Sequence, residues 1–311
     1  MYSQKLNDVM HLIDLKPAGI ENFIASYVLK GSKVAIIETG PPVSIENLLA
    51  GLQEIGIKTE EVDYVAVSHV HVDHAGGAGA LLHHLPNARL LVHARGAPHM
   101  VHPQKLWTQA RQVLGKVADM YGEPKPVPEE RVIVATDGMV IHLGEEVEVR
   151  VLETPGHASH HLSFYEKNGG IFPGDAAGVY LSRFDVVVPT TPMPFHLEMA
   201  LASLDRLIKT APRRLYYTHF GQTDDAVKKL RTHATQLKLW ARIVLDGVET
   251  GKDMVTICER VLEEDPAIKA AADLIKGHMM LSRGVIMQNI QGFIEYFRRI
   301  FPANLSSKTH T

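Results

Sequence analysis

The sequence contains a single cysteine, Cys258, among its 311 residues. An internal disulfide is therefore excluded, and a lone thiol fits a reducing compartment. Long apolar runs are absent as well: no stretch approaches the roughly 18 consecutive apolar residues of a transmembrane helix. The N-terminal segment also lacks the basic, apolar and small-residue regions of a secretory signal. We therefore expect a cytoplasmic protein without a membrane partner.

The sequence has no strong net charge. It contains 32 Lys and Arg residues against 35 Asp and Glu residues, which gives a formal net charge of −3 at pH 7. This balance argues against nucleic acid as the partner, because proteins that bind it usually present a large basic surface. With 45% hydrophobic and 22% charged residues, the composition is that of a globular protein, and the length suggests about two domains. A small molecule is the expected partner, and a homodimer is left open.

Short β-rich runs recur through the first two thirds of the chain. They are rich in Val, Ile and Tyr and are bounded by Gly, Pro, Asp or Asn, which is typical of strands in a core. Helical periodicity lies between several of them, so the pattern predicts an α/β architecture. The expected strands cover residues 23–29, 34–38, 64–68, 90–93, 132–135, 147–152, 162–165, 171–172 and 215–218, and the expected helices cover 44–55, 78–85, 97–121 and 197–208.

The strand signals stop after about Gly221, and helical periodicity continues to the end of the chain. Thr223 or Asp224 is the expected N-cap of the first helix, and Gly247 and Gly251 are expected breaks. The pattern predicts two consecutive domains, an α/β domain over 1–221 and a helical domain over 222–311. Further helices are expected over 252–262, 266–281 and 285–300.

The sequence is rich in histidine, with 18 residues, and concentrates four potential metal ligands directly after an apolar strand. Imidazole and carboxylate together suit Zn²⁺, Fe or Mn²⁺. Ligands this close in sequence can surround an ion only if the backbone turns sharply, which Gly76 and Gly77 would permit. A His-rich surface loop is the alternative, and the spacing argues against it. The four residues are His69, His71, Asp73 and His74.

Three further candidate ligands lie just past the carboxyl ends of expected strands. His157 follows the strand at 147–152, Asp175 follows the one at 171–172, and His219 follows the one at 215–218. Loops on a rigid strand scaffold are suited to hold a site while leaving it open to substrate. Each residue alone is more readily a loop residue than a ligand. Together with the first cluster, however, they predict a metal centre.

With these residues in this order, the sequence resembles the metallo-β-lactamase superfamily, and within it the glyoxalase II-like branch. The family signature is His-x-His-x-Asp-His followed by a His, a bridging Asp and a final His, and the match covers about residues 20–221. The resemblance implies a four-layered αββα sandwich, followed here by a helical C-terminal domain. It implies two divalent ions, with Zn²⁺ favoured and Fe or Mn as alternatives. The first ion would be held by His69, His71 and His157, the second by Asp73, His74 and His219, with Asp175 bridging both.

The resemblance also implies a dinuclear metal-dependent hydrolase. Two ions make a bridging hydroxide available at neutral pH, and this hydroxide would cleave carboxylic esters, thioesters or phosphoesters. Asp73 is the expected catalytic residue, because a ligand with a free carboxylate oxygen can orient the hydroxide and carry a proton. The alternative is a mononuclear iron oxidoreductase of the persulfide dioxygenase type, which leaves the second metal site empty. The presence of all seven ligands favours the esterase or phosphoesterase.

Residues near the ligands have expected supporting roles. Asp63 matches a family Asp that steadies the His-rich loop, or it is a turn residue ahead of a strand. Glu38 stands where many relatives carry Asp, which puts the bracing by its loop in doubt. His161 is expected to be a buried hydrogen-bonding group rather than a ligand, and His160 faces either the pocket or solvent.

The sequence predicts the substrate less closely than it predicts the metal ligands. Lactonases of this fold resemble one another in a Tyr three residues after the bridging Asp, where this chain has Gly178. Tyr180 could substitute for it or pack in the loop, and His196 could protonate a leaving group or cap a helix. Candidates for an apolar pocket wall, with core packing as the alternative, are Met100, His102, Trp107, Tyr121, Trp240, Met279 and Met280.

Overall fold

The structure is a computed structural model that describes residues 1–271 and 282–301, and it divides into two compact units. The predicted domains are consecutive, whereas the units are interleaved along the chain. A unit defined by contacts is not a test of independent folding, so the boundary at residue 221 stays a prediction. The first unit comprises Met1–Glu153, His160–Gly174 and Arg213–Asp224, and the second comprises Thr154–Ser159, Asp175–Pro212 and the described residues from Asp225 onward.

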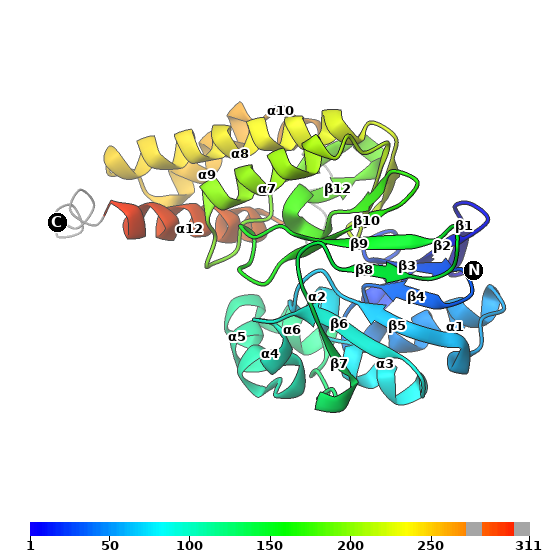
Figure 1. The fold of residues 1–311 in the computed structure, drawn as a ribbon. Coiled ribbons are helices and arrows are strands. Elements are labelled where there is room, and N and C mark those ends of the chain that lie inside the picture. Colours follow the sequence, from blue (N-terminus) through cyan, green and yellow to red (C-terminus); the bar gives the residue numbers. More distant parts are fainter. Residues whose placement is uncertain (272–281, 302–311) are drawn as a thin grey trace. The chain divides into compact units, whose positions relative to one another are not determined.

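Two β-sheets build the first unit (Figure 1). The first sheet has seven strands in chain order: β1 (Ser3–Lys5), β2 (Met10–Asp14), β3 (Ala25–Lys30), β4 (Val34–Ile37), β5 (Val62–Ala66), β6 (Arg89–His93) and β7 (Val132–Ala135). The second has the order β15 (Gly221–Thr223), β14 (Arg214–Tyr217), β11 (Gly170–Phe172), β10 (Leu162–Glu166), β9 (Glu148–Glu153) and β8 (Val140–His142).

Strand direction in the first sheet places two functional loops at one edge. Strands β4 to β7 pair in parallel, so their carboxyl ends share an edge. Glu38 follows β4 at this edge, and the His-rich loop follows β5. In the second sheet β11 and β14 are also parallel, and His219 lies just past the end of β14.

The two sheets share one apolar core, in which Tyr27 links them by a hydrogen bond. Its hydroxyl donates to the carbonyl oxygen of Tyr217 at 2.6 Å, and its ring packs edge-on against Phe172. The β-branched and aromatic residues from which the strands were predicted lie buried in this core. The core includes Met10, Leu12, Leu29, Ile37 and Leu91 from the first sheet and Ile141, Val149, Val151, Leu162, Phe164 and Tyr216 from the second.

All nine expected strands are present, with ends shifted by at most two residues. The sequence patterns missed six short strands, among them the edge strand β15, whose residues after Gly221 are polar and carry no apolar alternation. The expectation that strands stop at about Gly221 is therefore wrong, because β15 continues to Thr223 and pairs antiparallel with β14. The other missed strands are β1, β2 and β8, together with β12 (Val179–Leu181) and β13 (Val186–Val188) of the second unit.

Helices cover the outer side of the seven-stranded sheet (Figure 1): α1 (Ile45–Glu54), α2 (Val72–Ala75), α3 (Ala78–His84), α4 (Ala97–Val101), α5 (Gln104–Leu114) and α6 (Lys116–Tyr121). The segment expected over 97–121 is helical as predicted, but it is three helices rather than one. His102, the residue before Pro103, adopts φ −125° and ψ 77°, and Gly115 adopts φ 55° and ψ −125°, neither of which a helix can contain. Both α5 and α6 contact α2.

The second unit is mainly helical, with α8 (Ala226–Glu249) in contact with α7 (Leu197–Lys209), α9 (Met254–Glu264) and α12 (Arg283–Ile300). The expected N-cap is wrong by one residue, because Asp225 holds this position. The predicted break at Gly247 is also wrong. A Cβ there would lie 2.5 Å from Ile257, so glycine lets α9 approach α8 rather than ending it.

The helix expected over 266–281 begins as predicted with α10 (Pro266–Ala270), and its remainder lies outside the described residues. Asp265 caps α10, since its carboxylate accepts hydrogen bonds from the backbone N–H groups of Ala267 and Ile268. Among the described residues, no helix combines the length and apolarity needed to cross a membrane.

Candidate metal centre

The His-rich loop leaves β5 and enters α2 within a few residues. The carbonyl oxygen of His74 accepts hydrogen bonds from the backbone N–H groups of Thr39 and Gly40, at 2.9 and 3.1 Å, so α2 is tied to the loop after β4. The two glycines do not serve the turn as expected, because neither adopts a positive φ. Close packing explains Gly77 instead, since a Cβ there would lie 2.4 Å from Ile45.

Three predicted ligands converge in the first unit. Their ligand atoms, from Asp73, His74 and His219, all lie within 4.8 Å of one another. The Nε2 atoms of His74 and His219 are 3.2 Å apart, and the His219 Nε2 is 3.6 Å from a carboxylate oxygen of Asp73. Both imidazoles are buried, whereas the Asp73 side chain keeps 24% of its surface exposed.

The hydrogen-bond partners of the two Nδ1 atoms set the tautomers of His74 and His219, and so determine whether each Nε2 carries a lone pair. The His219 Nδ1 is 3.1 Å from the carbonyl oxygen of Phe23, which can only accept, so this nitrogen carries the hydrogen. The His74 Nδ1 is 3.4 Å from a carboxylate oxygen of Glu38, which favours the same tautomer. Each Nε2 then presents a lone pair to the other. Two facing lone pairs at 3.2 Å repel, and a cation between them removes the repulsion, so the donor set fits a metal ion.

Glu38, rather than Asp63, is the carboxylate that braces the His-rich loop. Its side chain is 2% exposed, and the same oxygen that faces His74 accepts a hydrogen bond from the backbone N–H of Ser68 at 3.2 Å. The expectation for Asp63 is wrong in this respect, because its carboxylate accepts from the backbone N–H of Val34 at 2.8 Å and so ties β5 to β4. The doubt about bracing by Glu38 is likewise removed.

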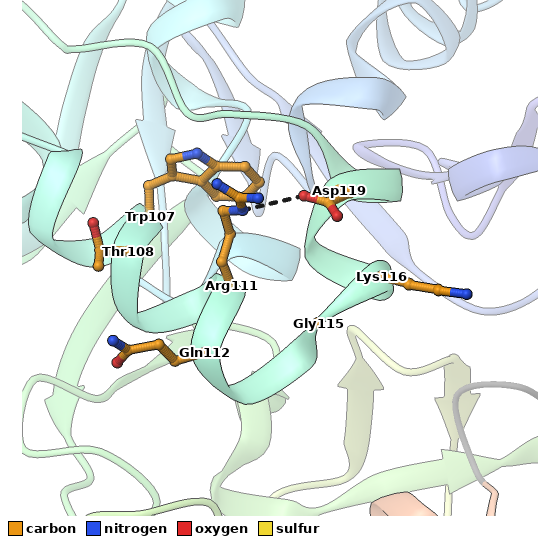
Figure 2. Close-up of a pocket in the computed structure, with 7 residues that line it drawn as sticks. All are labelled: Trp107, Thr108, Arg111, Gln112, Gly115, Lys116 and Asp119. Atoms are coloured by element: carbon orange, nitrogen blue, oxygen red, sulfur yellow. Dashed lines mark ion pairs between the residues drawn. The ribbon is translucent and has the colours of Figure 1, made fainter.

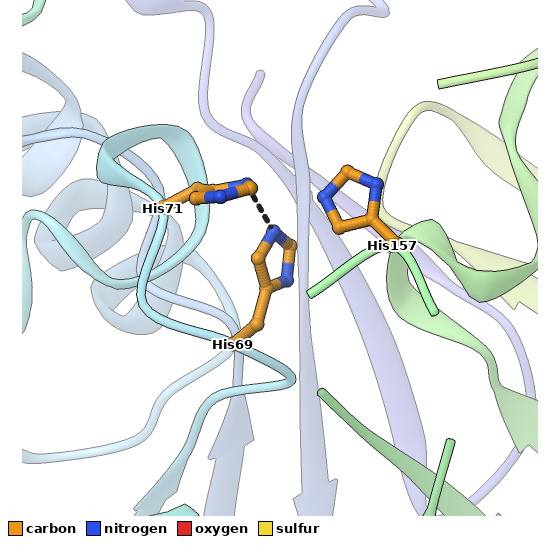
Figure 3. A group of neighbouring side chains, drawn as sticks. All are labelled: His69, His71 and His157. Atoms are coloured by element: carbon orange, nitrogen blue, oxygen red, sulfur yellow. Dashed lines mark hydrogen bonds between the residues drawn. The ribbon is translucent and has the colours of Figure 1, made fainter. Parts of the chain in front are cut away.

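His69 and His71 lie side by side in the same loop. The Nε2 of His69 is 2.8 Å from the Nδ1 of His71, as the dashed line in Figure 3 shows. The Nδ1 of His69 faces the Ser68 hydroxyl at 3.0 Å. His161 is buried with its ring 5.0 Å from that of His69, as expected for a supporting group, and His160 is half-buried with its ring 6.0 Å from that of His71.

The remaining two predicted ligands pair in the second unit. The Nε2 of His157 is 3.4 Å from a carboxylate oxygen of Asp175, and both side chains are buried. The His157 Nδ1 is 3.0 Å from the carbonyl oxygen of Thr190, so this nitrogen carries the hydrogen. A lone pair therefore faces a carboxylate, which again suits a cation between them. The structure thus groups the seven predicted residues by unit, and their division between two ions stays a prediction.

A small cavity lies behind His157 and Asp175 within the second unit. Its volume is about 10 Å³, and its other lining residues are Thr154, Pro155, Ala176, Thr190, Phe195, Ala200, His233 and Leu237. The sequence patterns did not single out His233, which lies on α8 and is 2% exposed. Burial lowers the pKa of its imidazole to about 4, although Gln236 and Asp175 act in the opposite direction. His233 is therefore neutral at physiological pH.

The partners of Tyr180 favour its structural alternative. The Tyr180 hydroxyl donates to the carboxylate of Asp185 at 2.8 Å, and the Lys229 ammonium lies 2.6 Å from the same carboxylate oxygen. His196 occupies the N-cap position of α7, but its side chain makes no capping hydrogen bond, and its Nδ1 is 3.3 Å from a carboxylate oxygen of Glu198. Tyr180 is therefore bound within the second unit, whereas His196 does not cap α7 through its side chain.

A groove of about 430 Å³ lies on α5 and α6, the helices that contact α2 (Figure 2). Trp107 is half-buried there, and the Arg111 guanidinium pairs with Asp119 at 3.2 Å. Thr108, Gln112, Gly115 and Lys116 complete the lining. Of the other expected wall residues, Met100, Tyr121 and Trp240 are buried, His102 is exposed, and Met279 and Met280 lie outside the described residues.

Residues 19–219 match the model of the Metallo-beta-lactamase superfamily. The metallo-beta-lactamase fold-containing protein ST1585 of Sulfurisphaera tokodaii is 30% identical over 217 residues, which are 68% of this chain and 78% of that protein. An N-acyl homoserine lactonase of Bacillus thuringiensis is 24% identical over 183 residues, or 58% of this chain and 63% of that protein.

Solved structures agree with the sequence match. The crystal structure of ST1585 from Sulfolobus tokodaii superposes with a TM-score of 0.69 at 27% identity, covering 92% of this chain and 98% of that chain. The structure of TTHA1429 from Thermus thermophilus, at 22% identity, gives a TM-score of 0.70 and covers 95% of each chain. These likenesses confirm the predicted fold class.

Proposed function

Since the chain belongs to the metallo-β-lactamase superfamily, we propose that it is a hydrolase that binds two divalent ions and cleaves ester-type bonds. The observation that carries the proposal is the pair of Nε2 atoms on His74 and His219, 3.2 Å apart, each in a ring whose other nitrogen faces an acceptor. Such a pair is suited to a cation and to little else at this depth of burial.

The family order assigns the proposed ligands. His69, His71 and His157 would hold one ion, and Asp73, His74 and His219 the other, with Asp175 shared between them. Imidazole with carboxylate is a donor set that Zn²⁺ accepts readily, and Fe or Mn²⁺ also accept it. We therefore propose Zn²⁺ as the resident ion, two per chain.

Two such ions supply a hydroxide at neutral pH and polarise the carbonyl or phosphoryl oxygen of a substrate. The chain's own residues do the rest. Asp73 keeps part of its carboxylate exposed, so its free oxygen can orient the attacking group and take up its proton. Glu38 and the Phe23 carbonyl hold the His74 and His219 rings in one tautomer, which fixes the direction of both Nε2 lone pairs.

We propose ester-type substrates, and two residues that follow Asp175 argue against lactones among them. The Bacillus thuringiensis relative is named a lactonase, but here Gly178 stands three residues after Asp175, and the phenol of Tyr180 is bound to Asp185. Lactones are therefore not the substrates we expect. The groove on α5 and α6 is lined by the Trp107 ring and Lys116, and its Arg111 is paired with Asp119, so esters with an aromatic group belong in the first substrate panel.

The test is hydrolysis before and after removal of metal. The full chain would be assayed on p-nitrophenyl carboxylic esters, a thioester, bis(p-nitrophenyl) phosphate and a lactone, then treated with dipicolinate and reconstituted with Zn²⁺. We expect ester hydrolysis that chelation abolishes and Zn²⁺ restores, with lactone turnover the slowest. Hydrolysis that survives complete metal removal would contradict the proposal. Oxygen consumption with a persulfide and no hydrolysis would favour the iron oxidoreductase instead.

A further inference from the structure

A buried polar network in the second unit ends at the cavity beside Asp175. It begins at Asp265, whose Oδ1 accepts the backbone N–H groups at the start of α10. The other oxygen, Oδ2, accepts the Nε2–H of Gln236 at 2.8 Å and the indole N–H of Trp240 at 2.6 Å. Asp265 is 1% exposed, and its backbone partners and the Trp240 indole can only donate, so both of its oxygens act as acceptors. The network is therefore internally consistent in its donors and acceptors.

The carboxylate fixes which way the Gln236 amide points. Because the Asp265 Oδ2 acts as an acceptor, the NH₂ group of Gln236 faces it, and the Oε1 of Gln236 faces the other way. This Oε1 can only accept, and it is 3.5 Å from the Nδ1 of His233, so the contact, although long, favours an Nδ1–H donor. His233 is thereby held as the neutral tautomer whose Nε2 carries a lone pair.

The His233 ring lies against the segment that carries Asp175. A Cβ on Gly178 would come within 2.9 Å of the His233 Cε1, so only glycine leaves room for the ring at this point. The backbone N–H of Gly178 donates to the carbonyl oxygen of Asp175 at 3.1 Å. His233 and Asp175 both line the small cavity, which holds about 10 Å³. A single water needs roughly this volume and two or more polar partners.

We propose that His233 is a positioning residue for Asp175: its Nε2 accepts a hydrogen bond from one water in this cavity, and the water donates its second hydrogen to the Asp175 carboxylate. The inference rests on the proposed role of Asp175 as a metal ligand. Ligating carboxylates need such partners to hold their rotation, and loss of one typically costs about 10–100-fold in metal affinity. In this way α8 and α10, which carry none of the seven predicted ligands, fix the orientation of one of them.

The first test reads the tautomer directly and needs no metal. Metal-free full-length protein labelled with ¹⁵N-histidine would be examined by long-range ¹H–¹⁵N correlation NMR, with His233→Gln used to assign the signals. We expect His233 as the Nδ1–H tautomer with an unprotonated Nε2. Gln236→Met, which removes the Oε1 partner, should shift the population towards the Nε2–H form. An Nε2–H tautomer in the wild-type chain would overturn the proposal.

The second test compares metal affinity in matched variants. His233→Phe keeps a ring but removes the acceptor, whereas His233→Gln keeps an acceptor oxygen. Ile243→Val, also buried on α8, loses packing without any polar contact and is the control. We expect the Zn²⁺ affinity, measured by competition with a chromophoric chelator, to fall about 10–100-fold in His233→Phe, to recover in part in His233→Gln, and to stay unchanged in Ile243→Val.

Thermal unfolding of each metal-free variant separates this effect from a loss of folding. Wild-type affinity in a folded His233→Phe variant would contradict the proposal, and so would equal losses in His233→Phe and Ile243→Val. If the wild-type chain binds no divalent ion, the proposed function fails, whereas the tautomer measurement still decides the state of His233. The two failures are therefore distinguishable.

Discussion

The two units support their candidate ligands in different ways. In the first unit each ring meets its partner directly, His219 at a backbone carbonyl and His74 at the buried Glu38, over 3.1 and 3.4 Å. In the second unit His157 likewise meets a backbone carbonyl, that of Thr190 at 3.0 Å, but Asp175 adjoins a cavity that His233 also lines, and the network that includes His233 has a 3.5 Å contact between two side chains of α8. Direct contacts of this kind fix the orientation of the His74 and His219 rings. The proposed support of Asp175 through His233 would depend instead on how α8 and α10 pack.

The largest expected effect comes from removing a proposed ligand in either unit, which tests whether the candidate ligands of both units are needed for activity. Asp175→Ala and His71→Ala should each lower kcat/KM by more than about 100-fold, because a lost ligand costs more than a lost partner of a ligand. Asp175→Ala should also lower the metal content, since two cations without a bridging carboxylate repel each other. Wild-type rates and metal content in either variant would contradict the dinuclear assignment.

The next effect tests the direct brace of the first unit. Glu38→Leu should lower Zn²⁺ affinity by about 10–100-fold, because the Nδ1–H of His74 and the N–H of Ser68 lose their acceptor. Glu38→Gln should lose less, since its amide oxygen can still accept. Competition with a chromophoric chelator measures both. If Glu38→Leu binds Zn²⁺ as tightly as wild type, metal binding by the His-rich loop does not depend on this carboxylate.

A smaller effect concerns stability and pH in the second unit. Burial lowers the pKa of His233 from 6.5 to about 4, so the unfolded chain binds more protons between these values and stability falls as the pH drops from 6.5 towards 4. Between pH 7.5 and 5.5 this group should cost roughly 1 kcal/mol of the free energy of unfolding. Metal-free wild type should therefore lose about this much more than His233→Gln in urea titrations. Equal losses would show that the imidazole is not buried as described.

The smallest effect is expected at Cys258. It is buried on α9, and burial raises the pKa of its thiol, so it is a poor nucleophile. Cys258→Ser should leave kcat/KM unchanged, as measured on the best ester of the panel. Full inactivation of a variant that still folds would point to a thiol mechanism.

The candidate ligands could be identified in the sequence because each follows an apolar strand, and the strand signal is local. The parallel order of β4 and β5 then brings Glu38 and the His-rich loop to one edge of the first sheet. The bracing role of Glu38 could not be predicted, although a charged residue directly after the apolar strand β4 is a signal that points to it. Glu38 adopts a positive φ of 67°, a backbone conformation that sequence patterns do not reveal.

The network behind Asp175 could not be predicted, because it depends on how helices pack. His233 and Gln236 lie three residues apart on one face of α8, which is a visible spacing, but their partner Asp265 comes from another helix. The predicted helix break at Gly247 is wrong for the same reason. A glycine in a helical pattern favours a break unless a neighbouring helix requires its small size, and the sequence does not show that neighbour.

The most direct test of the central claim is elemental analysis of the full-length chain purified without added metal. Inductively coupled plasma mass spectrometry, referred to a protein concentration from amino-acid analysis, would give the metal content per chain. The account predicts close to two Zn²⁺ per chain, with loss of both on dialysis against dipicolinate. One Fe per chain with no second ion would contradict it.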